Sequence, residues 1–138
     1  MDKIIKCIAA IASGLCGFLF GEIDGLMYAL IAFMLIDYVT GVLAALAKKE
    51  LSSKIGFVGI AKKAVMLALV AVGHIVDVYI LVGDGTMCRS AVAGLYIANE
   101  GMSILENADK LGIPLPNIIK SVFKQLKNKS ESKDDKEE

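Results

Sequence analysis

A long apolar run, LMYALIAFMLIDYVTGVLAAL, occupies residues 26–46 and contains one charged side chain, Asp37. Its 21 residues are enough for a helix to cross about 30 Å of hydrocarbon. Ten of them are Leu, Ile, Phe or Val. Each of these favours insertion by about 0.3 to 0.6 kcal/mol, whereas a central Asp opposes it by about 2.5 to 3.5 kcal/mol. Because the apolar residues offset the acid, the run predicts a membrane-spanning helix.

Two further apolar runs flank this segment. Residues 4–20 form a 17-residue run with one charge, Lys6, which is near the lower length limit for a span. Residues 64–82 form a 19-residue run with eleven Leu, Ile, Phe or Val residues. We expect the second of these runs to insert despite His74 and Asp77.

A fourth segment, residues 87–105, is less apolar. Its five Leu, Ile or Val residues do not clearly outweigh Arg89, Asn99 and Glu100. It therefore either inserts by pairing with residues 64–82 or lies partly in the membrane interface. The predicted fold class is all-α: a polytopic membrane protein with three to four transmembrane helices, a short C-terminal amphipathic helix and a charged tail.

The composition supports a division of the chain into an apolar membrane part and a charged tail. The chain has 138 residues, 56% of them hydrophobic, and a mean hydropathy of +0.63, whereas soluble proteins are about 45–50% apolar. Residues 127–138 hold nine of the thirty Asp, Glu, Lys and Arg residues. The sequence GIPLP at 112–116 contains a glycine and two prolines, which break the helical pattern. We expect a membrane-embedded domain at 1–116, followed by a cytoplasmic amphipathic segment and charged tail at 117–138.

Several functional classes find no support in the sequence. The net charge is +0, so nothing indicates a nucleic-acid partner. The three cysteines lack CxxC spacing and the chain has one histidine, so neither a disulfide framework nor a zinc site is predicted. No Ser/His/Asp arrangement, phosphate-binding loop or dinucleotide-binding fingerprint occurs. We expect no enzymatic activity, no catalytic residue, no cofactor and no metal, and we expect a tight turn at residues 83–86.

The distribution of lysines predicts the orientation in the membrane. Lys3 and Lys6 precede the first run, and five more lysines lie between the runs at 26–46 and 64–82. The linkers after the first and third runs are acidic, with Glu22, Asp24 and Asp84. Under the positive-inside rule, four spans with both termini in the cytoplasm satisfy this pattern, with Arg89 as the exception. Three spans result if residues 4–20 or 87–105 do not cross.

Polar side chains inside membrane segments are candidate functional residues, because they are costly there. On residues 26–46, a narrow stripe is formed by Asp37, Gly41, Ala44 and Lys48, and Thr40 lies beside it. This stripe indicates either contact with water and other helices or one buried acid bonded to a neighbouring helix. Residues 87–105 carry a clearer stripe at alternating spacings of four and three, composed of Arg89, Ala93, Tyr96, Glu100, Ser103 and Asn107. This face either contacts water in a lesion, which we favour, or rests at the membrane surface. Asn99 is a further polar candidate.

His74 and Asp77 are three residues apart, so they can pair on one helix face. A proton relay is conceivable, but a structural pair, or one that faces Arg89, is the stronger interpretation. Small residues also recur at four-residue spacing, which lets helix backbones approach closely in lipid. The pairs are Gly17 with Gly21, Gly41 with Ala45, and Gly94 with Ala98. They make self-association into a homo-oligomer plausible.

Two blocks of the sequence resemble the toxin-secretion/phage-lysis holin family. The first is DYVTG at 37–41, followed by Ala44, Ala45, Ser52, Ser53, Gly56, Gly59 and Lys63; the second is NEGMSILEN at 99–107, followed by GIPLP at 112–116. The resemblance covers about residues 36–116. It implies a protein that accumulates in the bacterial host cytoplasmic membrane, oligomerises in the bilayer and forms a timed lesion. An endolysin, or a large toxin, is then released without needing direct contact.

Two other classes remain open. One is a small oligomeric multidrug-type or ion transporter that uses a membrane-embedded carboxylate, with Asp37 or Glu100 as the candidate. The other is a membrane-embedded scaffold subunit without a pore. Lysis on expression with an endolysin distinguishes the holin from both.

Overall fold

A computed structural model gives the fold and describes residues 1–82 and 86–134. These residues form α1 (Asp2–Phe20), α2 (Gly25–Ala47), α3 (Ser53–Ile75), the π-helical continuation η1 (Val76–Ile80), α4 (Met87–Lys110) and α5 (Asn117–Asp134). No strand occurs among the described residues, so the predicted all-α class is confirmed. The turn predicted at 83–86 lies, at residues 83–85, outside the described part of the chain.

Local signals in the sequence set the helix boundaries. The Asp24 carboxylate accepts a hydrogen bond from the Met27 amide at 3.0 Å and caps α2. Ser52 Oγ accepts one from the Ile55 amide at 3.3 Å and caps α3. Helix α1 ends at Gly21, whose φ of 69° is a conformation that glycine adopts without strain.

Three helices are long and apolar enough to cross a membrane: α1, α2 and the continuous helix formed by α3 with η1. The last of these begins at Ser53, eleven residues before the apolar run that predicted it. We did not predict a helix in this first part of α3, because its lysines are typical of a basic loop: Lys54, Lys62 and Lys63. Helix α4 does not qualify as a span, in agreement with its marginal apolar content.

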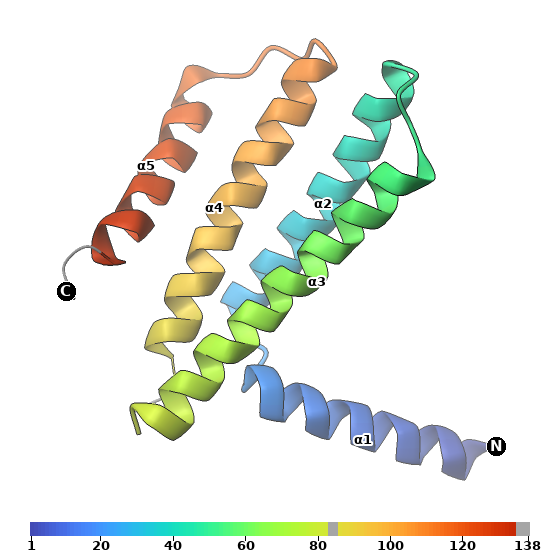
Figure 1. Cartoon of the computed structure of the whole chain (residues 1–138), viewed down its shortest axis with the longest axis vertical. Helices are drawn as coiled ribbons and strands as arrows, with labels where there is room; N and C mark the ends of the chain where they lie inside the picture. The colour runs from blue at the N-terminus through green and yellow to red at the C-terminus, as the bar shows by residue number, and fades with distance from the viewer. Residues whose placement is uncertain (83–85, 135–138) are drawn as a thin grey trace.

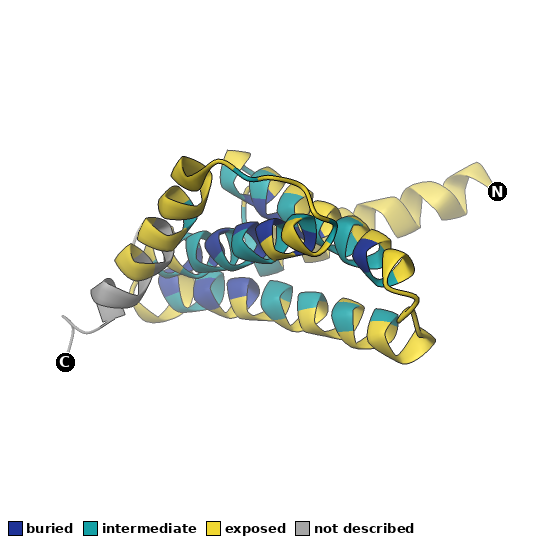
Figure 2. Ribbon diagram, turned by 90° about the horizontal axis from the view of Figure 1, so that it is seen from above, coloured by how far each residue is buried: buried dark blue, intermediate teal, exposed yellow. Residues whose placement is uncertain are grey.

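Helix α4 lies in the middle of the assembly and contacts α2, α3 and α5 (Figure 1). Helices α2 to α5 run alongside one another, whereas α1 leaves the group at one end, where it contacts α3 and, through Phe18 and Tyr79, η1. The buried apolar cluster joins α2, α3 and α4, through Met27, Leu30, Met34, Val70 and Ala93. Figure 2 shows burial concentrated where these helices meet, while α1 is exposed along nearly its whole length.

Helix α5 follows the predicted break at residues 112–116 and packs back onto α4. The Phe123 ring lies 5.9 Å from the Phe33 ring of α2, edge to face, and over Gly101 of α4. The helix continues to Asp134, so it includes much of the charged tail that the sequence predicted after the amphipathic segment. Lys, Gln and Glu have high helix propensity, which explains how a charged segment extends the helix.

Candidate functional site

The polar face of α4 points into the protein. Arg89, Glu100 and Asn107 are only 3%, 3% and 6% exposed, although they are among the most polar residues of their helix. The helical spacing correctly placed these residues on one face. Within this chain that face is covered by α2 and α3, and its contact with water in a lesion stays a prediction.

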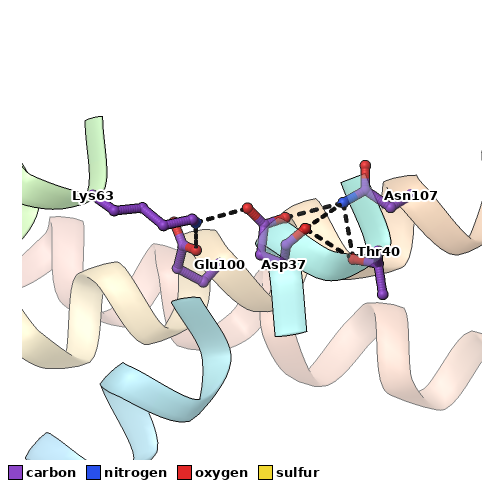
Figure 3. Close-up of polar contacts among 5 residues, drawn as sticks. All are labelled: Asp37, Thr40, Lys63, Glu100 and Asn107. Atoms are coloured by element: carbon purple, nitrogen blue, oxygen red, sulfur yellow. Dashed lines mark hydrogen bonds and ion pairs between the residues drawn. The ribbon is translucent and has the colours of Figure 1, made fainter. Parts of the chain in front are cut away.

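A polar network joins three helices at the middle of this face (Figure 3). Lys63 Nζ of α3 donates to Asp37 Oδ2 of α2 at 2.8 Å and also binds Glu100 Oε2 of α4. Asn107 Nδ2 of α4 donates to Asp37 Oδ1 at 3.1 Å and to Thr40 Oγ1 at 3.1 Å. The Thr40 hydroxyl in turn donates to the Asp37 carbonyl at 3.1 Å. One ammonium group therefore serves two carboxylates, one from each neighbouring helix.

The network lies deep along the helices. Asp37 is eleven residues before Lys48 at the end of α2, which corresponds to about 16 Å at 1.5 Å per residue. Lys63 is a similar number of residues from the start of α3. Charges at such depth in a membrane require partners, and removing one partner of a buried pair is far more damaging than replacing the pair. Lys63, Asp37 and Glu100 are thus mutually dependent.

A second polar cluster anchors the beginning of α4. The Asp77 carboxylate, on η1, accepts hydrogen bonds from the backbone amides of Cys88 at 2.8 Å and Arg89 at 2.9 Å. It thereby caps α4, because the Thr86 side chain makes no capping hydrogen bond there. The negative charge of Asp77 is also favourable at a helix N-terminus. No hydrogen bond joins His74 to Asp77 among the described residues; the His74 ring lies against Gly21.

Arg89 connects the same end of α4 to the linker between α1 and α2. Its guanidinium donates to Asp24 Oδ2 at 2.8 Å and to the Glu22 carbonyl at 2.7 Å. The bond from Arg89 holds the pKa of the Asp24 carboxyl below its usual value, and the Met27 amide acts in the same direction. A carboxylate in an acidic linker thus neutralises a buried arginine.

A cavity of about 750 Å³ opens between α2 and α3, with α4 as its floor. Asp37, Lys63, Glu100, Asn99 and Ser103 line its inner part. Among the described residues, no group of three or more His, Cys, Asp or Glu side chains is placed to hold a metal ion.

Comparison with known proteins identifies the family. The sequence pattern of the bacteriophage holin family matches residues 14–128. This chain belongs to the bacteriophage holin family. It is 32% identical to a probable holin of Bacillus phage phi105, over 88% of this chain and 87% of that protein. It is also 40% identical to an uncharacterized protein of Listeria monocytogenes, over 99% of both chains, and 39% identical to an uncharacterized protein of Clostridium perfringens, over 96% and 100%. No solved structure matches the chain.

Membership of the holin family confirms the resemblance found in the sequence. Holins are membrane-pore proteins and not enzymes, in agreement with the expected absence of enzymatic activity. The matched residues include the network of Asp37, Thr40, Lys63, Glu100 and Asn107 and most of α5. Most of α1 lies before the matched region.

The small-residue pairs of this holin occupy different surroundings. Gly41 lies against Asn107, because a Cβ atom at Gly41 would be 3.5 Å from Asn107 Nδ2, and Ala45 lines the cavity. Ala98 is buried, whereas Gly17 and Gly94 have open space around them. Only Gly41 of these residues therefore approaches the polar network, and self-association through the other positions stays a prediction.

The roles of two residues of the site, Lys63 and Asn107, were not predicted from the sequence. Lys63 belongs to the block that resembles the holin family, but it was assigned to a loop, so its pairing with membrane acids was not expected. Asn107 was placed on the correct face without a role. Its spacing of seven residues from Glu100 was the signal that both side chains lie on the same face of α4.

Proposed function

We propose that this holin accumulates in the cytoplasmic membrane of a bacterial host, oligomerises there and forms lesions at a set time. The lesions release an endolysin, or a large toxin, and the host cell lyses. Membership of the holin family, the similarity to a probable phage holin and the three apolar helices support this proposal.

The observation that carries the proposal is the polar face of α4 enclosed by apolar helices. While Lys63 pairs with Asp37 and Glu100, the chain presents a mainly apolar surface to lipid. A water-filled lesion needs polar walls, and α4 has the most polar face among the described helices of the membrane-embedded domain. Lesion formation then consists of exchanging contacts within one chain for contacts with water and with other copies.

Lysis of a bacterial host tests this function. The protein is expressed from an inducible promoter together with an endolysin that lacks a secretion signal. We expect growth to continue for a delay and then to end abruptly, with endolysin activity outside the membrane. Continued growth with the protein present in the membrane fraction contradicts the proposal.

Two substitutions connect the function to the network. Asp37→Asn and Glu100→Gln keep the side-chain shape and remove one charge each. We expect both variants to reach normal membrane levels and to shift the time of lysis, with the larger shift for Glu100→Gln. Unchanged timing in both variants, at matched protein levels, reduces the two acids to packing residues.

The proposed orientation places both termini and the loop between α2 and α3, at residues 48–52, in the cytoplasm, as the lysine distribution favours. It requires α4 to cross the bilayer against α2 and α3. A reporter enzyme fused after Glu138 or inserted into this loop should be active only on the cytoplasmic side. Extracytoplasmic activity of the loop fusion contradicts the orientation.

The transporter alternative rests on the carboxylates of Asp37 and Glu100, both of which line the cavity. Lys63 binds both of them, which leaves neither carboxylate unpaired for a cationic substrate. The geometry therefore favours the holin. Substrate-dependent efflux without loss of host viability would support the transporter instead.

A further inference from the structure

The open end of the cavity between α2 and α3 carries positive charge. Lys48 at the end of α2, Lys54 in the first turn of α3 and Lys110 at the end of α4 line it, together with one acid, Glu50. None of these three lysines forms an ion pair within the described part of the chain, whereas Lys63 deeper in the cavity is paired twice. Three lysines against one acid give the cavity mouth a net positive charge.

Apolar side chains border the same mouth. Leu51, Ile55 and Val58 line the cavity and are also 47%, 56% and 42% exposed on the outer surface. The ends of α2, α3 and α4 that meet here are ends of the helices that cross or accompany the bilayer (Figure 1). The lysines thus lie at the level where a membrane helix enters water, and the apolar border begins immediately below them.

We propose that this mouth binds the headgroup of an anionic phospholipid, with one acyl chain lying along Ile55 and Val58 between α2 and α3. Phosphate suits a cluster of lysine ammonium groups, and basic recesses between transmembrane helices are known forms of headgroup site. The cavity volume of about 750 Å³ is in the range of small-molecule sites. The acids of the network do not oppose such a ligand directly, because they lie about 15 Å deeper and are bound to Lys63.

Lipid explains the mouth better than a soluble anion. A free phosphate would contact the lysines but leave Leu51, Ile55 and Val58 in contact with water. An acyl chain covers this surface, and each buried methylene group contributes about 0.8 kcal/mol. The lipid would also bridge α2, α3 and α4 through their lysines, at the end of the bundle farthest from the Arg89 cluster. This site does not depend on the lysis function.

The test uses the full-length protein purified in a neutral detergent. Dioleoyl phosphatidylglycerol and dioleoyl phosphatidylcholine are titrated separately, and retained lipid is counted by native mass spectrometry. The triple variant Lys48→Gln, Lys54→Gln and Lys110→Gln removes three charges from the mouth. The matched control Lys3→Gln, Lys6→Gln and Lys120→Gln removes the same charge from exposed positions of α1 and α5.

We expect the wild type and the control to retain phosphatidylglycerol in preference to phosphatidylcholine, and the mouth variant to bind it about tenfold more weakly or worse. All six lysines are exposed, so both variants should keep the helical content of the wild type, which circular dichroism checks. Equal retention by the mouth variant and the control overturns the site. Displacement of the lipid by millimolar inorganic phosphate overturns the lipid as its occupant.

Discussion

Helices α1 and α4 differ in composition and in burial: the apolar helix is exposed, and the polar helix is buried. Helix α1 is apolar and qualifies as a membrane span, yet none of its residues is buried in the protein. Helix α4 is too polar to qualify, yet seven of its residues are buried, including Arg89, Glu100 and Asn107. In a bilayer, apolar side chains gain nothing by leaving lipid for protein, whereas polar side chains must find partners. Between these two helices, the apolar one is left exposed and the polar one is buried against protein, as the different needs of their side chains in a bilayer predict.

The largest expected effect comes from removing the cation that holds α4 in place. Lys63→Met leaves Asp37 and Glu100, whose side chains are 15% and 4% exposed, without their shared partner, and breaking such a largely buried pair costs about 3–5 kcal/mol. We expect a loss of this size in the free energy of unfolding, measured in neutral detergent. Lys62→Met is the control, because the neighbouring side chain is exposed and has no ion pair among the described residues. Equal losses in both variants would show that the network does not hold α4.

The contact between α4 and α5 gives the next effect. A Cβ atom at Gly101 would clash with the Phe123 ring, whereas one at Gly94 on the same helix meets nothing within 4 Å. We expect Gly101→Ala to destabilise the protein by about 1–3 kcal/mol through overpacking and to speed tryptic cleavage within α5. Gly94→Ala should leave stability unchanged or raise it, since alanine favours a helix by about 0.5–1 kcal/mol. Equal behaviour of the two variants contradicts the docking of α5.

A smaller effect is expected where α1 meets the rest of the chain. The Phe18 and Tyr79 rings lie 6.1 Å apart, and aromatic pairs of this kind contribute about 0.5–1.5 kcal/mol. Phe18→Ala should cost an amount in this range, and Ile11→Ala, which alters an exposed position far from α3, should cost less than about 0.5 kcal/mol. Thermal unfolding in detergent measures both. A larger loss for Ile11→Ala would indicate that α1 packs elsewhere.

The smallest effect is a pH dependence at the linker. Because Arg89 lowers the pKa of Asp24 in the folded protein, this bond stabilises the fold above the ordinary Asp pKa of about 3.9 and is lost as the pH falls through the lower folded value. The Asp24 side chain is 42% exposed, so solvent limits the gain to about 1 kcal/mol or less. Asp24→Asn should flatten the decrease in Tm below pH 4, and Asp109→Asn, at an exposed position with no ion pair to the described residues, should not.

The sequence predicted the long apolar helices. Residues 26–46 and 64–82 are apolar by their own composition, so these runs located α2 and the second half of α3 with η1. The helical spacing of Arg89, Glu100 and Asn107 also placed these residues on one face. The direction of that face depends on Asp37 and Lys63, which are 63 and 37 residues from Glu100 along the chain. Local periodicity carries no information about such distant partners.

The pairings of Asp77 and Lys63 were difficult to predict for the same reason, because their partners lie on other helices. Asp77 was expected to pair with His74 or to face Arg89, and its bonds go to the backbone amides of Cys88 and Arg89 on the next helix. Lys63 was assigned to a loop because lysine is rare in membrane helices, and only the acids on α2 and α4 make it tolerable there. Polar residues of a membrane protein are thus easy to detect and difficult to pair from one sequence.

A double-mutant cycle between Lys63 and Glu100 tests most directly whether pairing inside the chain holds the polar face of α4. The free energy of unfolding is measured in neutral detergent for the wild type, Lys63→Met, Glu100→Gln and the double variant. If Lys63 neutralises Glu100, removing the acid should relieve part of the damage caused by Lys63→Met. The double variant should then be more stable than Lys63→Met alone, with a coupling of about 0.5–3 kcal/mol. Losses that add to within about 0.5 kcal/mol would contradict the account, because independent residues behave in this way.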